Sequence, residues 1–189
     1  MLVSIMGSPC SGKTTVAAKV FAALKEQGFS SEFITEQARS YIAERKYNQQ
    51  SQNLSLNDSD QVEIFERQYK QENFFSYSAH QNTVILCDSS SLNSILYMTP
   101  ELAGTEFINR KILKSLKNIN CIFYCKPLST YDSEDVNRVH DQNFALELDK
   151  KILSFAESNN ITFDGILHGT ATERANQMLT TILSKMVNS

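Results

Sequence analysis

The segment that most restricts the fold of this chain is residues 7–14, Gly-Ser-Pro-Cys-Ser-Gly-Lys-Thr, which match the pattern G-x-x-x-x-G-K-[ST]. The apolar run Leu2–Gly7 leads into the pattern and favours a buried strand. The segment Lys13–Gln27 follows with apolar residues at helical spacing, and Gly28 after it is a typical helix stop. A strand, a glycine-rich loop and a helix in this order distinguish a structured loop from a chance match. The chain therefore begins with one strand–loop–helix unit.

Further apolar runs, rich in Val, Ile, Phe and Tyr, predict four more buried strands: Phe29–Glu36, Thr83–Asp88, Cys121–Lys126 and Ile161–Leu167. Segments between and after them predict helices: Gln37–Tyr47, Asp58–Ala79 (capped by Asn57 or Ser59), Thr105–Leu116, Phe144–Ala156 and Ala171–Met186. Strands that alternate with helices form right-handed crossover units and a mostly parallel sheet. We therefore predict an α/β fold, with five strands in the sheet and both of its faces covered.

Composition restricts the domain number and the partners. The chain has 189 residues, 41% of them apolar, which is typical of a single globular domain spanning residues 1–189. Its net charge of -3 shows no basic excess, so we expect no nucleic-acid partner. No apolar stretch approaches the ~20 residues that span a bilayer, and the start MLVSIMG does not resemble a signal peptide. We expect a cytoplasmic protein with reduced, mostly buried cysteines and no membrane partner.

Two polar segments interrupt the alternation of strands and helices. Residues 48–59 are rich in Gln, Asn and Ser, and residues 128–143 are polar and charged. Both are long for passive connections, so each is either a functional segment or merely disordered. We treat the first as a flexible flap and the second as a lid.

The glycine-rich loop has the features of a phosphate-binding loop. Its glycines let successive backbone N–H groups point at an anion, and the helix that begins near Gly12 adds its positive end. Lys13 can bridge phosphate oxygens, and the Thr14 hydroxyl can ligate Mg²⁺. We therefore expect ATP and Mg²⁺ as cofactors, with the nucleotide held by nine consecutive residues: Gly7, Ser8, Pro9, Cys10, Ser11, Gly12, Lys13, Thr14 and Thr15.

Two acidic residues end predicted strands. Open α/β sheets bind ligands at the carboxyl ends of their parallel strands. Asp88 ends the third strand and is the expected second support for Mg²⁺, although it could also cap a helix that starts near Ser90 or Ser91. Glu36 ends the second strand and could accept the proton of an attacking hydroxyl or hold a sugar diol. Arg39, one turn later, could contact substrate or simply pair with Glu36.

Two further polar residues are candidates. Arg138 lies in the lid segment, from which an Arg can move onto transferring phosphates and stabilise developing charge. Gln68 lies on the long helix 58–79, where a planar amide beside Tyr69 could recognise a heterocycle, although the residues alone favour an exposed Gln. His140 has the character of a surface residue.

Together, six segments resemble one family of small-molecule kinases that contain a phosphate loop: GSPCSGKTT, TEQARSYIAE, FERQYKQENFF, VILCDSS, DVNR and HGTATER. The family is the ribosylnicotinamide kinase domain of bacterial NAD-biosynthesis regulators, with the AAA-named domains grouped with it. The resemblance implies a three-layer P-loop NTPase fold with a lid, and ATP-dependent phosphorylation of a ribosyl 5′-hydroxyl, as on nicotinamide riboside or another nucleoside.

The same resemblance implies roles for individual residues. Asp135 and Arg138 fall on the family's lid motif, and Gln68 falls on a Gln of its central helix. Deoxynucleoside kinases are similar in placing a general base where Glu36 stands. The chain departs from the pattern at Val136, which replaces a lid glycine, and at Ser90, which replaces a second acid. Because Trp is absent, Tyr41, Tyr69 or Phe74 would have to stack on a base.

Two other functions stay open at this point. A nucleoside monophosphate kinase would need more cations near the acceptor than Arg39, Arg45 and Arg67. A regulatory module that binds or slowly hydrolyses ATP would need no acceptor. The sequence leaves the oligomeric state undetermined.

Overall fold

The computed structural model describes residues 1–49, 55–80, 82–128 and 142–187 of the chain. A five-stranded sheet, parallel throughout, has the order β2–β3–β1–β4–β5. The strands are β1 (Leu2–Met6), β2 (Ser31–Ile34), β3 (Val84–Cys87), β4 (Cys121–Cys125) and β5 (Gly165–Leu167). This sheet confirms the predicted α/β fold, and it places the carboxyl ends of β1, β2 and β3 along one edge.

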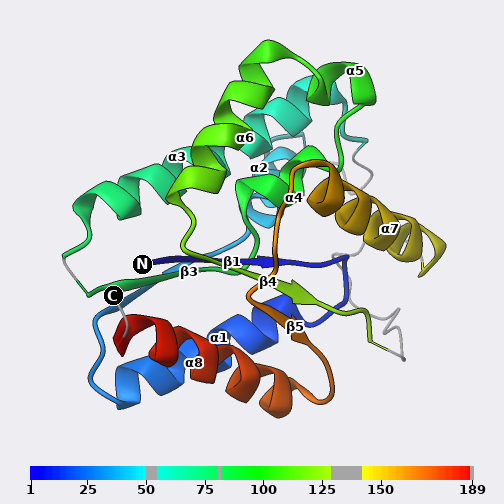
Figure 1. Cartoon of the computed structure of the whole chain (residues 1–189). Helices are drawn as coiled ribbons and strands as arrows, with labels where there is room; N and C mark the ends of the chain where they lie inside the picture. Colours follow the sequence, from blue (N-terminus) through cyan, green and yellow to red (C-terminus); the bar gives the residue numbers. More distant parts are fainter. Residues whose placement is uncertain (50–54, 81, 129–141, 188–189) are drawn as a thin grey trace.

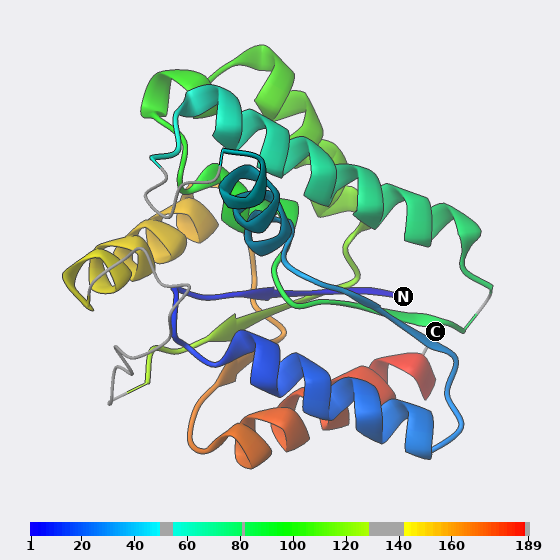
Figure 2. The ribbon, with the colours of Figure 1, turned by 180° about the vertical axis from the view of Figure 1, so that it is seen from behind.

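Helices cover both faces of the sheet, as the two opposite views show (Figure 1, Figure 2). One face carries α1 (Lys13–Glu26) and α8 (Ala171–Val187). The other carries α2 (Gln37–Gln49), α3 (Asp58–Ser78), α4 (Ser91–Ile95), α5 (Pro100–Ala103), α6 (Glu106–Asn118) and α7 (Gln142–Ser158).

Alternate side chains of the central strands pack into the core on both faces of the sheet. Val3, Ile5 and Phe123 pack with Val20 of α1 and Met178 of α8 on one face of the sheet. On the other face, Met6 and Tyr124 pack with Phe65, Ile108 and Ile152 from three helices. Because both faces are buried, the strands read as continuous apolar runs, which is why they could be predicted.

The two edge strands are shorter than predicted. The segment Phe29–Glu36 is strand only over Ser31–Ile34, because the Phe29 N–H donates to the Leu24 carbonyl and closes the end of α1. The segment Ile161–Leu167 is strand only over Gly165–Leu167. There, the Asp164 carboxylate accepts the Ile122 N–H at 2.8 Å in place of a backbone carbonyl.

Helix ends follow local capping chemistry. Asn57, one of the two predicted caps, caps α3 in a reciprocal pair with Asp60. Thr105 lies just outside α6 and caps it, and the helix runs on to Asn118. The short helix α5 was not predicted, although Thr99 and Pro100 are a typical helix start.

The predicted flap and lid are only partly described. Residues 48–49 end α2 and residues 58–59 begin α3, so the flap as predicted was too long, and residues 50–54 lie outside the described part of the chain. Residues 142–143 begin α7. Residues 129–141, with Asp135, Arg138 and His140, also lie outside it, so their predicted roles stay predictions.

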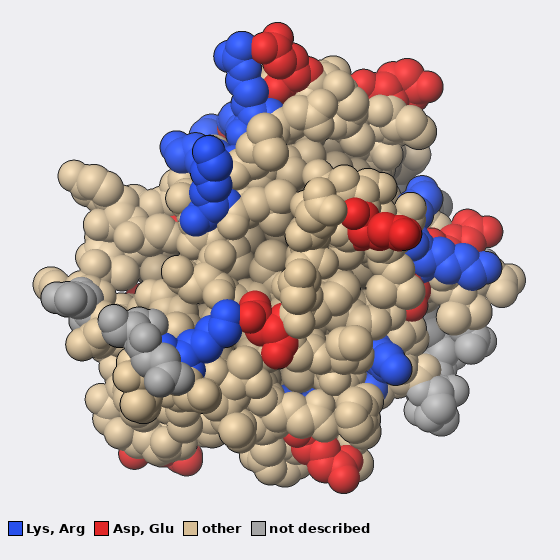
Figure 3. All heavy atoms as spheres, viewed as in Figure 1, with Lys and Arg blue, Asp and Glu red and all other residues tan. Residues whose placement is uncertain are grey.

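The face of the molecule drawn in Figure 3 shows no dominant charge. On the face drawn in Figure 3, basic side chains gather over α6 but acidic side chains stand beside them. Within the described ranges, no helix combines the length and the apolar character needed to cross a membrane. Cys87, Cys121 and Cys125 are buried and Cys10 is half-buried, all as free thiols, as predicted.

Candidate active site

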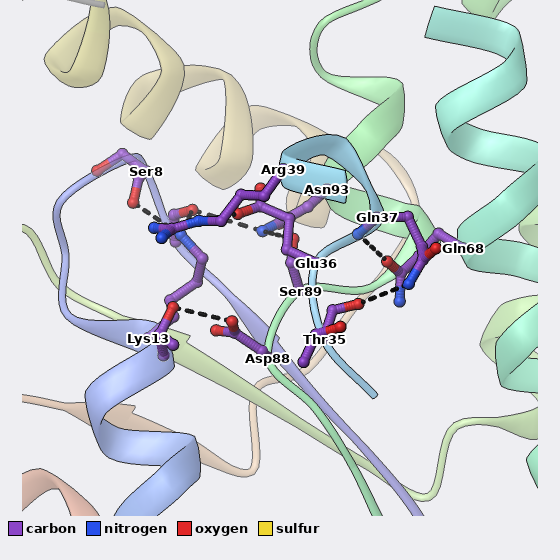
Figure 4. A network of polar contacts seen from close by, with 12 residues as sticks. Ser8, Lys13, Thr35, Glu36, Gln37, Arg39, Gln68, Asp88, Ser89 and Asn93 are labelled. Carbon is purple, nitrogen blue, oxygen red and sulfur yellow. Dashed lines mark hydrogen bonds and ion pairs between the residues drawn. The ribbon is translucent and has the colours of Figure 1, made fainter. Parts of the chain in front are cut away.

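Three segments meet at the carboxyl edge of the sheet. Residues 7–12 follow β1, Asp88 follows β3, and Glu36 lies two residues beyond the end of β2. The Asp88 N–H donates to the Ile34 carbonyl at 3.0 Å, which fixes the ends of β2 and β3 side by side. Figure 4 shows the side chains of Lys13, Glu36, Arg39 and Asp88 converging there.

The phosphate loop is shaped by two glycines, one at a close contact and one at a positive φ. A side chain at Gly7 would place its Cβ 2.7 Å from both the Cys125 carbonyl oxygen and Ser11 Oγ, so only glycine fits. Gly12 has φ 85° and caps α1, a conformation that favours glycine. The loop therefore wraps closely against β4 and delivers the start of α1 to the site.

Lys13 and Thr14 sit at that helix start. Lys13 Nζ donates to the carbonyls of Gly7 and Ser8, both at 2.9 Å, so the ammonium lies over the loop where phosphate oxygens would bind. The Thr14 hydroxyl donates to Asp88 Oδ2 at 2.8 Å. Thr15 is exposed on the next position of α1.

Several buried polar atoms around this edge have no hydrogen-bond partner. They are Ser8 Oγ, Ser11 Oγ, Asp88 Oδ1, Ser90 Oγ, Asn93 Oδ1 and Gln68 Nε2. Buried polar groups in proteins are nearly always paired, so a cluster of unpaired ones needs an explanation. A polar ligand bound at this edge would give such atoms partners.

Asp88 has the character of a cation ligand. Its side chain is buried, and burial raises the pKa of its carboxyl above the ordinary value, with Glu36 acting in the same direction. The Thr14 hydroxyl and Lys13 oppose that rise in pKa. With one free oxygen and a hydroxyl beside it, the Thr14–Asp88 pair fits a Mg²⁺ ion that is also held by phosphates. Among the described residues, no group of three or more His, Cys, Asp or Glu side chains could hold a metal without such help.

Asp88 does not cap α4, the alternative that the sequence left open. The Ser91 N–H at the start of α4 donates instead to Glu72 Oε1 on α3 at 2.7 Å, and the Ser91 hydroxyl donates to Glu72 Oε2 at 2.7 Å. Burial raises the pKa of Glu72 to about 7, against these hydrogen bonds and the nearby Gln68 amide, which lower it.

Glu36 and Arg39 form an ion pair, which is one of the two alternatives that the sequence left open for Arg39. Arg39 Nε donates to Glu36 Oε2 at 3.2 Å, and the Arg39 side chain extends toward the phosphate loop (Figure 4). The Glu36 side chain keeps 27% of its surface exposed, so a substrate hydroxyl could reach it. Because both residues act electrostatically on Asp88, they belong to the same site.

Gln68 is buried, which differs from the exposed position that the residues alone favoured. Its Oε1 accepts the Gln37 N–H at 3.0 Å, at the start of α2, and its Nε2 has no acceptor within ordinary hydrogen-bond distance, although the amide acts as a donor toward Glu72 and lowers the pKa of that carboxyl. The side chain thus lies next to the segment that carries Glu36 and Arg39 (Figure 4).

The three aromatic candidates are spread out. The Tyr41 hydroxyl is buried and donates to Asp60 Oδ1 at 2.5 Å, which ties α2 to α3. Tyr69 stacks on Phe65 with the Lys111 ammonium over its ring. Phe74 is 66% exposed toward the far end of α3. The structure does not bring the three together, and Tyr41 has a structural partner of its own.

Sequence reasoning missed Asn93 and Glu72. Asn93 Nδ2 donates to Ser89 Oγ at 3.1 Å and approaches the Gly7 carbonyl at 3.5 Å, so α4 contacts the phosphate loop. Glu72 follows Phe65 by seven residues and Gln68 by four, a spacing that places it on the buried stripe of α3. From the sequence, this spacing could have identified Glu72 as a buried residue.

A wide hollow of about 1020 Å³ lies at the opposite, amino edge of the sheet. Its lining includes Met1, Asn73, His80, Lys117 and Asn120. None of the residues that line it has a buried unpaired polar side-chain atom. The chemistry-bearing residues therefore gather at the carboxyl edge and not in this hollow.

Comparison with known proteins shows the family and the fold of the chain. A family described as AAA domain matches residues 2–174. No curated protein gives a significant match. Among solved structures, the NadR protein in complex with NR has a TM-score of 0.71 at 18% identity, over 98% of this chain and 51% of that one. This chain therefore spans about half the length of NadR.

Two further structures align over nearly their whole length. Deoxyadenosine kinase from M. mycoides, with the products dCMP and dCDP, has a TM-score of 0.59 at 14% identity, over 97% of this chain and 100% of that one. The APS kinase CysC from M. tuberculosis has a TM-score of 0.51 at 15% identity, over 96% of each chain. At these identities the likeness shows the fold, which is that of P-loop kinases, as expected from the sequence.

Proposed function

Because the chain belongs to this AAA domain family, we propose that it is a kinase that transfers the γ-phosphoryl group of ATP to a hydroxyl of a nucleoside-like acceptor. The favoured acceptor is nicotinamide riboside, phosphorylated on its ribosyl 5′-hydroxyl. A cytoplasmic enzyme with a small-molecule substrate is the corresponding proposal for compartment and partner.

One observation carries the proposal: a partly exposed carboxylate, Glu36, lies beside Asp88 and the phosphate loop at one edge of the sheet. A nucleotide-binding switch needs the loop and the metal-binding Asp. A kinase also needs a group that accepts the proton of the attacking hydroxyl. In our proposal Glu36 does so, and Arg39 orients its carboxylate through the 3.2 Å contact.

The nucleotide half of the site uses the loop residues. In our proposal Lys13 leaves the Gly7 and Ser8 carbonyls and bonds phosphate oxygens, while the buried hydroxyls of Ser8 and Ser11 find partners. Mg²⁺, held by Thr14 and Asp88, would neutralise charge on the phosphates. Catalysis then rests on positioning and charge stabilisation, because a loose phosphoryl-transfer transition state needs little covalent help.

The acceptor half uses the start of α2 and the buried face of α3. Gln68 Nε2 is a buried donor without a partner, which suits a carbonyl or ring nitrogen on a flat heterocycle or carboxamide. Burying a substrate without such an acceptor would leave this donor unpaired, so it favours nucleoside-like ligands. Arg138 on the lid segment is proposed to approach the phosphates, on the sequence resemblance alone.

The test uses the pure protein with ATP, Mg²⁺ and a pool of nicotinamide riboside, nucleosides and nucleoside monophosphates, with products identified by mass spectrometry. We expect one nucleoside-like acceptor to gain a phosphate, and Glu36→Gln to abolish that product. Glu32→Gln, an exposed residue on β2, is the matched control and should retain activity. A new nucleoside diphosphate, formed from one of the pooled nucleoside monophosphates, would show that the protein is a monophosphate kinase instead. ATP binding without any phosphorylated acceptor would favour a regulatory module.

A further inference from the structure

The segment HGTATER, residues 168–174, follows β5 and makes contacts that have no role in the proposed reaction. Gly169 has φ 90°, and Thr170 and Glu173 form a reciprocal cap at the start of α8: the Thr170 N–H donates to Glu173 Oε2 at 2.7 Å and the Glu173 N–H donates to Thr170 Oγ1 at 3.3 Å. This cap occupies the Glu173 carboxylate and turns the next residue, Arg174, toward the sheet edge.

Arg174 is a buried cation that joins three loops. Only 4% of its surface is exposed. Its Nη1 donates to the Ser11 carbonyl at 2.8 Å and to the Lys126 carbonyl at 2.7 Å, and its Nε donates to the Gly169 carbonyl at 2.8 Å. These carbonyls belong to the phosphate loop, to the segment after β4 and to the segment after β5.

The contact with Ser11 controls the direction of a backbone donor. The Ser11 carbonyl and the Gly12 N–H belong to one peptide group, and in a trans peptide the two point in opposite directions. The guanidinium, together with the Cys125 thiol that donates to the same carbonyl at 3.1 Å, holds that oxygen away from the loop interior. The Gly12 N–H is thereby directed inward, where an anion binds.

The charge of Arg174 also indicates that an anion binds in the phosphate loop. Within the part of the chain that the structure describes, no carboxylate forms an ion pair with it. A buried charge without a counter-charge is unfavourable, and an anion bound in the adjacent loop would supply one.

We infer that Arg174 is a positioning residue for nucleotide phosphates, which sets the Gly12 amide for phosphate binding by holding the Ser11 carbonyl. The inference rests on the proposed nucleotide site but on no particular acceptor. An Arg suits this position because its planar fork donates from two separate nitrogens, Nε and Nη1, whereas a Lys has only one nitrogen from which to donate.

The first test compares Arg174→Lys, which keeps the charge, with Arg174→Gln, which keeps donors without charge. Affinities for AMP-PNP and for inorganic tripolyphosphate are measured by calorimetry. We expect both ligands to bind about tenfold more weakly or worse to both variants, since hydrogen bonds from a charged donor are lost. Ile182→Val, in the core of the same helix, lowers stability without touching the loops and should bind both ligands like the wild type. Wild-type affinity in folded Arg174 variants would overturn the inference.

The second test needs no variant, so it can refute the inference even if Arg174 substitutions fail to fold. Tripolyphosphate is added to isotope-labelled wild-type protein, and backbone amide resonances are followed by NMR. We expect the Gly12 amide proton to move downfield as it donates to phosphate. A Gly12 resonance that stays fixed while those of Lys13 and Thr14 move would refute the inference. Neither test involves an acceptor, so failure of the kinase proposal and failure of this inference are separable.

Discussion

The Thr14 hydroxyl donates a 2.8 Å hydrogen bond to Asp88, and this one contact joins the first turn of α1 to the end of β3. The two residues are 74 positions apart in the chain. They meet because the loop after β1 and the end of β3 lie on neighbouring parallel strands, with Ser4 of β1 in register with Cys87 of β3. The pair leaves Asp88 Oδ1 free for a cation.

Asp88→Asn should change how the activity of the protein depends on Mg²⁺ concentration. The amide oxygen can still accept the Thr14 hydroxyl, so we expect the fold to survive. The loss of the negative charge should lower activity by about tenfold or more, because even groups outside a metal's direct ligands have effects of that size. Activity is measured against Mg²⁺ concentration. Thr14→Ser, which keeps the hydroxyl, should stay close to wild type, and an Asp88→Asn enzyme with unchanged Mg²⁺ dependence would remove Asp88 from the metal site.

The sequence sufficed for those parts of the site that lie directly on strand ends. Gly7, Asp88 and Glu36 each follow an apolar run, and parallel strands bring their carboxyl ends to one edge, so local pattern plus one topological rule places them. Glu72 and Arg174 could not be placed in this way. Their roles depend on which loop faces which helix, and packing between distant segments determines that.

The Gly7 position should tolerate no side chain. A Cβ there would lie 2.7 Å from the Cys125 carbonyl oxygen and from Ser11 Oγ. Gly7→Ala should therefore lower the free energy of unfolding by about 1–3 kcal/mol through overpacking and weaken AMP-PNP binding. Chemical denaturation and calorimetry measure the two effects.

The matched control for that change is Gly28→Ala. Gly28 has φ 81°, and nothing lies within 4 Å of the place that a Cβ would take, so the substitution strains only the backbone. It should cost about 1–2 kcal/mol of unfolding free energy and leave AMP-PNP affinity unchanged. If Gly7→Ala binds AMP-PNP as tightly as Gly28→Ala does, the close approach at Gly7 is not needed for nucleotide binding.

Aromatic residues were the hardest to assign from the sequence. Tyr41, Tyr69 and Phe74 all have rings that could stack on a base, and a pattern alone cannot tell a ring in the core from one at a surface. In the structure the Tyr41 hydroxyl donates a hydrogen bond to the Asp60 carboxylate. That partner sits 19 residues away on another helix, where helical spacing gives no information.

Glu72 should make stability depend on pH. Its folded pKa of about 7 lies above the ordinary value of 4.5, so the folded protein holds the proton more tightly than the unfolded chain. This stabilisation is complete below about pH 4.5, falls as the pH rises through the interval to about 7 and is absent above it. The change amounts to about 3 kcal/mol of unfolding free energy over that interval.

The measurement compares unfolding free energies of wild type and Glu72→Gln between about pH 5 and pH 8, which brackets the folded pKa. Gln resembles the protonated acid and can still accept the Ser91 N–H. Burial also raises the pKa of Asp88 and of Asp149, so the wild-type curve alone does not isolate Glu72. The difference between the two proteins should shift in favour of Glu72→Gln as the pH rises. A difference that is constant with pH would show that Glu72 does not titrate in this range.

Gln68→Leu should separate acceptor binding from nucleotide binding. Leu removes the buried Nε2 donor and also the Oε1 acceptor of the Gln37 N–H, so the free energy of unfolding should fall by about 1–3 kcal/mol. If Gln68 contacts the acceptor, KM for the acceptor should rise by about tenfold or more, because a hydrogen bond to substrate is lost, while KM for ATP stays the same. Gln61→Leu, two turns earlier on α3, is the control for placing Leu on this helix. Equal rises in both KM values would mean that Gln68 only supports the start of α2, and an unchanged acceptor KM would exclude it from the acceptor site.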